Sequence, residues 1–260
     1  MDKFLMWRTV IDSYRFTFGN IGLFIKISLV WIVVSYAAAV AGAYGLIPAA
    51  PVDDSTNTAL SKILPYAVGL LAICAVAVAW HRACLLEERP ALPFATPFRI
   101  RVWKYLVASL VLLGLSYLIF ALSSFVILGV VGAGWTFIAL IVVVFALIFL
   151  IFIRLSLLYP ATAIQSATVT LARSWRLTKG KAFRLLAGMV IGVLPYTLAA
   201  KKLADWSGQR LIAGDLGPGI ALGLIAYALA FLCVALATAF LSAAYRELVP
   251  EVRDSIFVRE

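Results

Sequence analysis

The chain has 260 residues, of which 64% are apolar and 13% are charged, and it carries a net charge of +10. Soluble domains average roughly 45–50% apolar and about 25% charged residues, so this composition excludes an ordinary soluble domain, a disordered chain and a fibrous repeat. The long apolar runs lack the alternation of barrel strands and predict an all-α integral membrane protein.

Charged residues divide the chain into apolar stretches that predict six membrane-spanning helices. A helix needs roughly 20 apolar residues to cross a bilayer, so the 49 uncharged residues between Lys104 and Arg154 are divided at the glycine-rich turn 129–134. The predicted spans are residues 24–47, 63–83, 105–128, 134–157, 183–202 and 218–244. We expect no cleavable signal peptide, because charges interrupt residues 1–20.

Lysine and arginine are distributed unequally between the two predicted sides of the membrane. Eighteen lie in the N-terminal segment, the 82–104 loop, the 154–184 segment and the tail, whereas four lie on the other side. The positive-inside rule then predicts that both termini are cytoplasmic. This cationic side suits anionic lipid headgroups, although the same bias also serves membrane insertion alone. Nucleic-acid binding is not expected, because no compact soluble module is present.

An internal repeat organises the chain into three parallel units within a single membrane domain. One segment is repeated at an offset of 161: Thr9, Ser13, Arg15, Thr17 and Gly19 correspond to Thr170, Ser174, Arg176, Thr178 and Gly180. A weaker third copy lies at 101–104. Each unit is predicted to hold a cytoplasmic interfacial segment followed by a helical hairpin of two spans. The units are about 1–86, 87–159 and 160–247, followed by a tail at 248–260.

The interfacial segments are predicted to be helical in units one and three. The apolar stripes are Phe4, Trp7, Val10, Ile11, Tyr14 and Phe18 in the first, and Ile164, Ala167, Leu171 and Trp175 in the third. Gly19 and Gly180 are expected to act as C-terminal caps. Pro90, Pro93 and Pro97 favour an extended middle segment. Such helices lie in the headgroup plane or pack on the bundle, and the two interpretations are compatible.

Basic and aromatic residues beside these stripes are the candidate lipid-headgroup contacts. They are Arg15, Arg154, Arg173, Trp175, Arg176 and Lys179. Pro195 lies within the short fifth span, where a proline kink can mark a transport pathway or simply bend the helix.

The chain offers little catalytic chemistry. His81 is the one histidine and is interpreted as structural. No hydrolase, nucleotide-binding or metal-ligand spacing is found, so we predict no catalytic residue, no metal and no cofactor. No disulfide is expected among Cys74, Cys84 and Cys233. The scarcity of ionisable residues within the spans counts against ion-coupled transport.

Two segments carry a resemblance to a known family. The runs 154–161 (RLSLLYPA) and 172–180 (ARSWRLTKG) resemble the six-span membrane region found beside some bacterial glycerophosphodiester phosphodiesterases and in related stand-alone inner-membrane proteins. The catalytic domain of those enzymes uses histidine and metal-binding carboxylates, which have no match here. The resemblance therefore implies a bacterial inner-membrane region without the hydrolase.

These observations favour a non-enzymatic, multi-pass inner-membrane protein that contacts or organises anionic lipids through basic interfacial helices. Its expected partners are membrane lipids, with a membrane-protein partner or a second copy left open. Two alternatives remain, a transporter or lipid-translocating protein and a scaffold subunit for a partner protein. A membrane-embedded enzyme is the least favoured, because no acid–base pair converges.

Overall fold

A computed structural model describes residues 5–43, 54–89, 99–131, 134–167, 169–249 and 251. These residues form helices and connecting turns, with no strand among them. The helices are α1 (Met6–Gly19), α2 (Ile21–Ala43), α3 (Asp54–Leu86), α4 (Ile100–Val131), α5 (Trp135–Leu155), α6 (Leu158–Ala163), α7 (Leu171–Leu177), α8 (Ala182–Ile212) and α9 (Leu216–Leu248).

Six of these helices are long and apolar enough to cross a membrane, namely α2, α3, α4, α5, α8 and α9. Each of the six predicted spans corresponds to one of these helices, which supports a multi-pass membrane protein whose described part is helical. The division of the long apolar run is also correct, since α4 ends at Val131 and α5 begins at Trp135. The fifth span is not short, however. Although charges begin at Lys201, α8 continues to Ile212.

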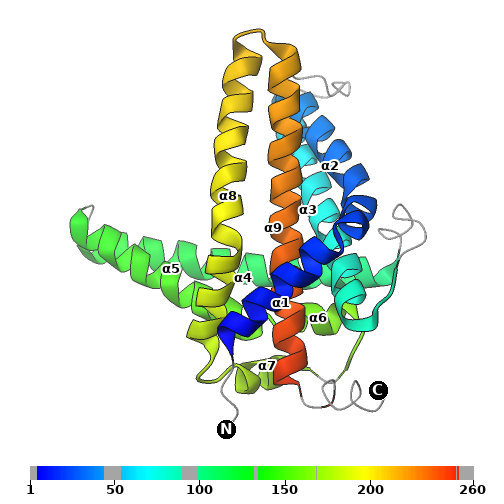
Figure 1. The fold of residues 1–260 in the computed structure, drawn as a ribbon. Coiled ribbons are helices and arrows are strands. Elements are labelled where there is room, and N and C mark those ends of the chain that lie inside the picture. Colours follow the sequence, from blue (N-terminus) through cyan, green and yellow to red (C-terminus); the bar gives the residue numbers. More distant parts are fainter. Residues whose placement is uncertain are drawn as a thin grey trace.

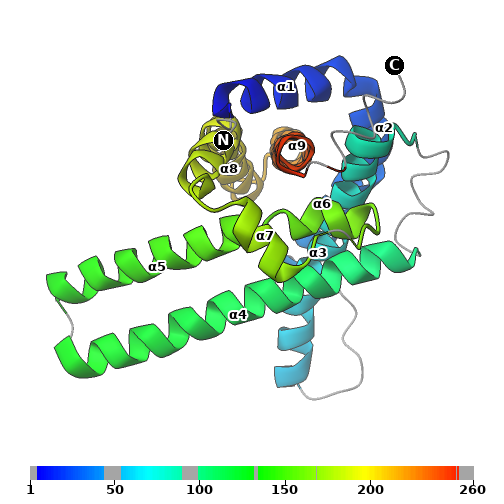
Figure 2. The ribbon, with the colours of Figure 1, turned by 90° about the horizontal axis from the view of Figure 1, so that it is seen from below.

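The hairpin of α8 and α9 is the centre of the bundle (Figure 1). We call the end with the connecting turn 213–215 the tip. The opposite end is the base, which holds α6, α7, the first turns of α8 and the last turns of α9. Helices α2 and α3 pack along α9, and α1 crosses α8 and α9 near the base (Figures 1 and 2). Small residues of α9, among them Ala235, Ala239 and Ala244, are buried and let its neighbours approach closely.

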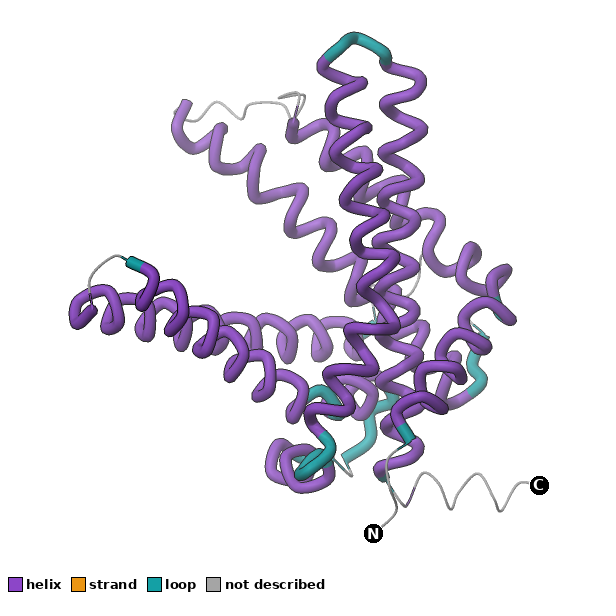
Figure 3. The backbone as a smooth tube through the Cα atoms, turned by 60° about the vertical axis from the view of Figure 1, so that its left-hand side comes forward, coloured by secondary structure: helices purple, strands orange, loops and turns teal. Residues whose placement is uncertain are grey.

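The hairpin of α4 and α5 extends sideways from this bundle (Figures 1 and 3). It joins the bundle near the base, where α4 contacts α3 and α6 and α5 contacts α7 and α8. Only 6% of the most apolar window of either helix is buried, against 39% for α9. The exposed side chains are mostly leucine, isoleucine, valine and phenylalanine, a surface suited to lipid tails.

Contacts between successive helix pairs follow a cyclic order. The second helix of each pair contacts the first helix of the next, so α3 contacts α4, α5 contacts α8, and α9 contacts α2. Three parallel repeats would produce this order. The three pairs nevertheless differ in direction (Figure 1), and the repeat and its hairpin units remain predictions.

The two predicted interfacial helices are present but differ in length. Helix α1 spans Met6–Gly19 and ends at the predicted glycine. The helix predicted for the third unit is too long at its start, because the chain turns at Gln165 (φ +57°) and α7 begins only at Leu171. The Thr170 hydroxyl caps α7 by accepting a hydrogen bond from the Arg173 N–H (3.3 Å). Ile164 and Ala167 therefore precede this helix.

The two predicted glycine caps also differ. Gly180 adopts a left-handed conformation (φ +72°) but lies beyond the C-cap of α7, which is Thr178, and Gly19 is the last residue of α1, whose C-cap is Asn20. Some sequence predictions lie outside the described residues. They concern Phe4, the prolines at 90, 93 and 97, and most of the tail at 248–260.

Candidate functional site

Helix α1 meets the bundle through small, mostly hydroxyl-bearing side chains. Its buried residues are Thr9, Val10, Ser13 and Thr17. This face was not predicted from the sequence, because only the apolar stripe and the basic residues beside it were considered. The clue was present in the recurrence of Ser and Thr at four-residue steps, which places them on one side of a helix.

Three large apolar side chains of α1 instead point away from the bundle, whereas Met6, Tyr14 and Phe16 pack partly against it. Trp7 is 60% exposed, Ile11 47% and Phe18 44%. The charged residues Arg8 and Arg15 are exposed on the third side of the helix. Helix α1 thus has one face for protein packing, one apolar face and one basic face.

Helix α7 repeats this arrangement. Ser174 and Thr178 are fully buried, as are Ser13 and Thr17 at the equivalent positions of α1. Leu171 and Trp175 are exposed apolar residues, and Arg176 and Lys179 are exposed basic ones. The two helices lie on opposite sides of α9 (Figure 2). The predicted contact residues are therefore divided between two surfaces of the base.

Arg154 and Trp175 are the predicted site residues that the structure brings together. The guanidinium carbon of Arg154 lies 4.4 Å from the centre of the Trp175 ring. The backbone carbonyl of Arg154 accepts hydrogen bonds from the hydroxyls of Ser174 (2.7 Å) and Thr178 (3.3 Å). These bonds fix α7 against the end of α5 and hold its basic face outward.

Arg173 is occupied within the protein. Its guanidinium forms an ion pair with Glu251, and this hydrogen bond lowers the pKa of the Glu251 carboxyl. Among the predicted headgroup contacts, Arg15, Arg176 and Lys179 are exposed. No ion pair joins these three to the acids that the structure describes.

Pro195 lies in an uninterrupted helix. The hydroxyl of Tyr14 donates a hydrogen bond to the carbonyl of Gly192 (2.8 Å), three residues before the proline. Burial, followed by the neighbouring Tyr196, raises the pKa of Tyr14. The hydrogen bond from Tyr14 to Gly192 attaches α1 to α8 next to the proline, which itself removes one backbone hydrogen bond from the helix.

His81 is completely buried and links three helices. Its Nδ1 lies 2.8 Å from the hydroxyl of Ser242 on α9, and its Nε2 lies 3.5 Å from the Tyr105 hydroxyl on α4. The Tyr105 ring contacts that of Tyr159, and burial raises the pKa of Tyr159 to about 12. No described carboxylate contacts His81, and its hydrogen bonds to other helices favour the structural role predicted for it.

A second group of charges, not recognised from the sequence, lies where α3 ends and α4 begins. Glu87 takes the left-handed conformation (φ +55°), and the Glu88 N–H returns to the carbonyl of Arg82 (3.4 Å). This turn brings the carboxylate of Glu88 against Nε of Arg82 and to 3.8 Å from Nη1 of Arg101. The hydrogen bond from Arg82 is the main cause of the lowered pKa of Glu88, and the charges of Arg101 and Arg99 add to it.

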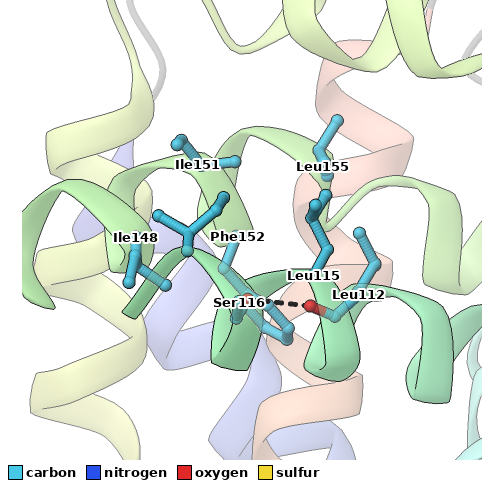
Figure 4. A pocket seen from close by; sticks show the side chains of 8 residues that line it. Leu112, Leu115, Ser116, Ile148, Ile151, Phe152 and Leu155 are labelled. Carbon is cyan, nitrogen blue, oxygen red and sulfur yellow. Dashed lines mark hydrogen bonds between the residues drawn. The ribbon is translucent and has the colours of Figure 1, made fainter. Parts of the chain in front are cut away.

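An apolar groove lies between α4 and α5 (Figure 4). It is lined by Leu112, Leu115, Ser116, Ile119, Ile148, Ile151, Phe152 and Leu155. The hydroxyl of Ser116 donates to the carbonyl of Leu112 (2.8 Å) and is therefore satisfied within its own helix. Such a lining suits a hydrocarbon chain and offers no reactive group.

Within the described part of the chain, no three histidine, cysteine or acidic residues come close enough to hold a metal ion. Cys74, Cys84 and Cys233 are free thiols.

No protein-family model, curated protein or solved structure matches this chain.

Proposed function

We propose that this multi-pass membrane protein contacts anionic lipid headgroups at its base, through the outward faces of α1 and α7. The proposal rests chiefly on the way α1 packs. Its hydroxyl face lies on the bundle, while Trp7, Ile11 and Phe18 and the basic face remain exposed. A helix that only closed the end of a bundle would be expected to bury its largest apolar side chains there.

The boundary between hydrocarbon and headgroups matches these exposed faces. Apolar side chains such as Trp7 and Ile11 can enter the acyl region, while Arg15 reaches the phosphates. Each lysine or arginine near an anionic surface contributes about 1 kcal/mol. The same arrangement in α7 places Arg176 and Lys179 beside Trp175, an aromatic residue typical of the interface.

The cationic base is proposed to face the cytoplasm from a bacterial inner membrane. The excess of lysine and arginine in the segments that meet at the base supports this orientation. The resemblance of 154–161 and 172–180 to the membrane region beside glycerophosphodiester phosphodiesterases favours the same membrane. No enzymatic role is proposed.

Assembly with another membrane protein is a second candidate function, favoured by the α4–α5 hairpin. This hairpin is the least buried of the helix pairs and projects from the bundle. A scaffold role predicts that site-specific photo-crosslinkers at Leu118 and Val142, both exposed, capture a protein. Capture of lipid alone at both positions would contradict it.

Native mass spectrometry of the gently extracted protein tests the lipid proposal. The double variant Arg15→Gln/Arg176→Gln should retain roughly thirtyfold less phosphatidylglycerol than the unmodified protein, because two headgroup contacts of about 1 kcal/mol each are lost. The matched control is Lys201→Gln/Arg210→Gln, which removes the same number of positive charges from α8 near the tip. Equal retention in the two double variants would refute the proposal.

A further inference from the structure

The charges at the junction of α3 and α4 are not balanced. The Glu88 carboxylate pairs with Arg82 and lies 3.8 Å from Arg101, and Arg99, which directly precedes α4, adds a third cation to this junction. The side chains of Arg82 and Arg101 are only 15% and 18% exposed. Water therefore screens this excess less than it would on an open surface.

The hydrogen bonds at this junction are incomplete as well. Arg82 is satisfied, because its Nε donates to Glu88 and its Nη1 donates to the carbonyl of Ala163 (3.2 Å). Arg101 is not satisfied. Its Nη1 is buried without a hydrogen-bond partner and lies 3.8 Å from the Glu88 carboxylate, which is too far for a hydrogen bond. Buried charged donors are normally paired, because leaving one unmade costs free energy.

We propose that Arg99 and Arg101 bind a phosphate group at this junction, with Arg82 holding Glu88 aside as a positioning residue. A phosphate brings several acceptor oxygens and about two negative charges, which would balance the three arginines and the one carboxylate. The phosphate is carried either by a lipid headgroup or by a small soluble molecule. This site shares no residue with the exposed faces of α1 and α7.

Binding of short-chain phosphatidic acid to the full-length protein in mild detergent, measured by calorimetry, tests this site. Arg99→Gln should weaken binding about tenfold, the effect of losing one charge-assisted hydrogen bond. Glu88→Gln should strengthen binding severalfold, because it removes the one anion that competes with the ligand. Arg89→Gln is the control. It has the same charge change in the same segment and should leave binding unchanged.

Competition identifies which molecule carries the phosphate. If inorganic phosphate at millimolar concentration displaces phosphatidic acid, the site takes a soluble phosphate; if it does not, the site takes a lipid. The titration is repeated in Arg15→Gln/Arg176→Gln, which lacks two of the proposed headgroup contacts. Adding Arg99→Gln to this double variant should still weaken the remaining binding about tenfold, so failure of the lipid-contact proposal is recognised separately. The phosphate site is refuted if no binding is detected, or if Arg99→Gln and Glu88→Gln both behave like Arg89→Gln.

Discussion

Lysine and arginine occur at both the tip and the base of the bundle, but their interactions differ between the two ends. At the tip, Lys201, Lys202 and Arg210 have local partners. Lys201 pairs with Asp205 (3.1 Å), and Arg210 pairs with Asp215 (2.9 Å). Lys202 lies 5.4 Å from the centre of the Trp206 ring.

At the base, acids are too few for the cations. Glu88 serves Arg82 and Arg101 together, and Arg15 and Arg176 have no ion pair among the described residues. The difference separates charges that are neutralised within the fold from charges available to an external anion. Among the described residues, the base therefore carries the excess of cations that could bind an external anion. The substitutions below test how far the two ends differ.

The largest expected difference concerns buried polar links between helices. His81→Ala, near the base, should lower the free energy of unfolding by about 2–4 kcal/mol, because it leaves a cavity and removes the partner of Ser242. Ser207→Ala, near the tip, removes one bond to the carbonyl of Gly219 (2.7 Å) and should cost about 1 kcal/mol. Reversible unfolding in mixed micelles measures both values. Equal losses would contradict a structural role for His81.

Two glycines of α8 should respond in opposite directions to alanine. A Cβ at Gly188 would lie 2.8 Å from the buried ring of Phe240, whereas at Gly192 nothing lies within 4 Å. Overpacking at Gly188 should destabilise the protein by about 1–2 kcal/mol, after the gain in helix propensity is subtracted. Gly192→Ala should stabilise it by about 0.5–1 kcal/mol. The same unfolding assay checks the signs, and a loss at Gly192 would show that α8 packs differently.

The equivalent serines of α1 and α7 should differ by a smaller amount. The hydroxyl of Ser174 joins α7 to the carbonyl of Arg154, while that of Ser13 donates to Val10 within its own helix. Ser174→Ala should cost about 1 kcal/mol and loosen α7, and Ser13→Ala should cost less. Protease sensitivity of the 164–181 segment measures the loosening. It should rise in the first variant only.

The smallest effect is a pH dependence at the base. Because the pKa of Glu88 is lowered in the folded protein, its ion pair with Arg82 contributes fully above the ordinary carboxyl pKa of about 4.3 and is lost as the pH falls through the lowered value. Glu88 is 43% exposed, so the contribution should be about 0.5 kcal/mol. Thermal unfolding between pH 3 and pH 7 should show it in the unmodified protein. Glu88→Gln should lack this component.

Span number and position follow from the sequence because they depend on apolar length alone. The run between Lys104 and Arg154 illustrates this, since a glycine-rich turn suffices to divide it. The end of α8 was less predictable. Lys201 and Lys202 interrupt the apolar run without ending the helix, because long cationic side chains can reach water from a continuous helix.

The candidate site was only partly predictable for a different reason. The residue types of α1 and α7 indicate an amphipathic helix, but which face packs on the bundle depends on tertiary contacts. The cluster at Arg82, Glu88 and Arg101 depends on the backbone reversal at Glu87. A left-handed glutamate has no sequence signal comparable to a glycine, so this juxtaposition becomes visible only in three dimensions.

Side-specific labelling tests the central claim most directly, namely that the cationic base lies on one side of the membrane and the tip on the other. In a variant without the three native cysteines, Lys179→Cys would report on the base and Ala213→Cys on the tip, with a membrane-impermeant maleimide applied to intact and inverted vesicles. We predict that Lys179→Cys reacts only from the cytoplasmic side and Ala213→Cys only from the opposite side. Reaction of both from the same side would contradict the account.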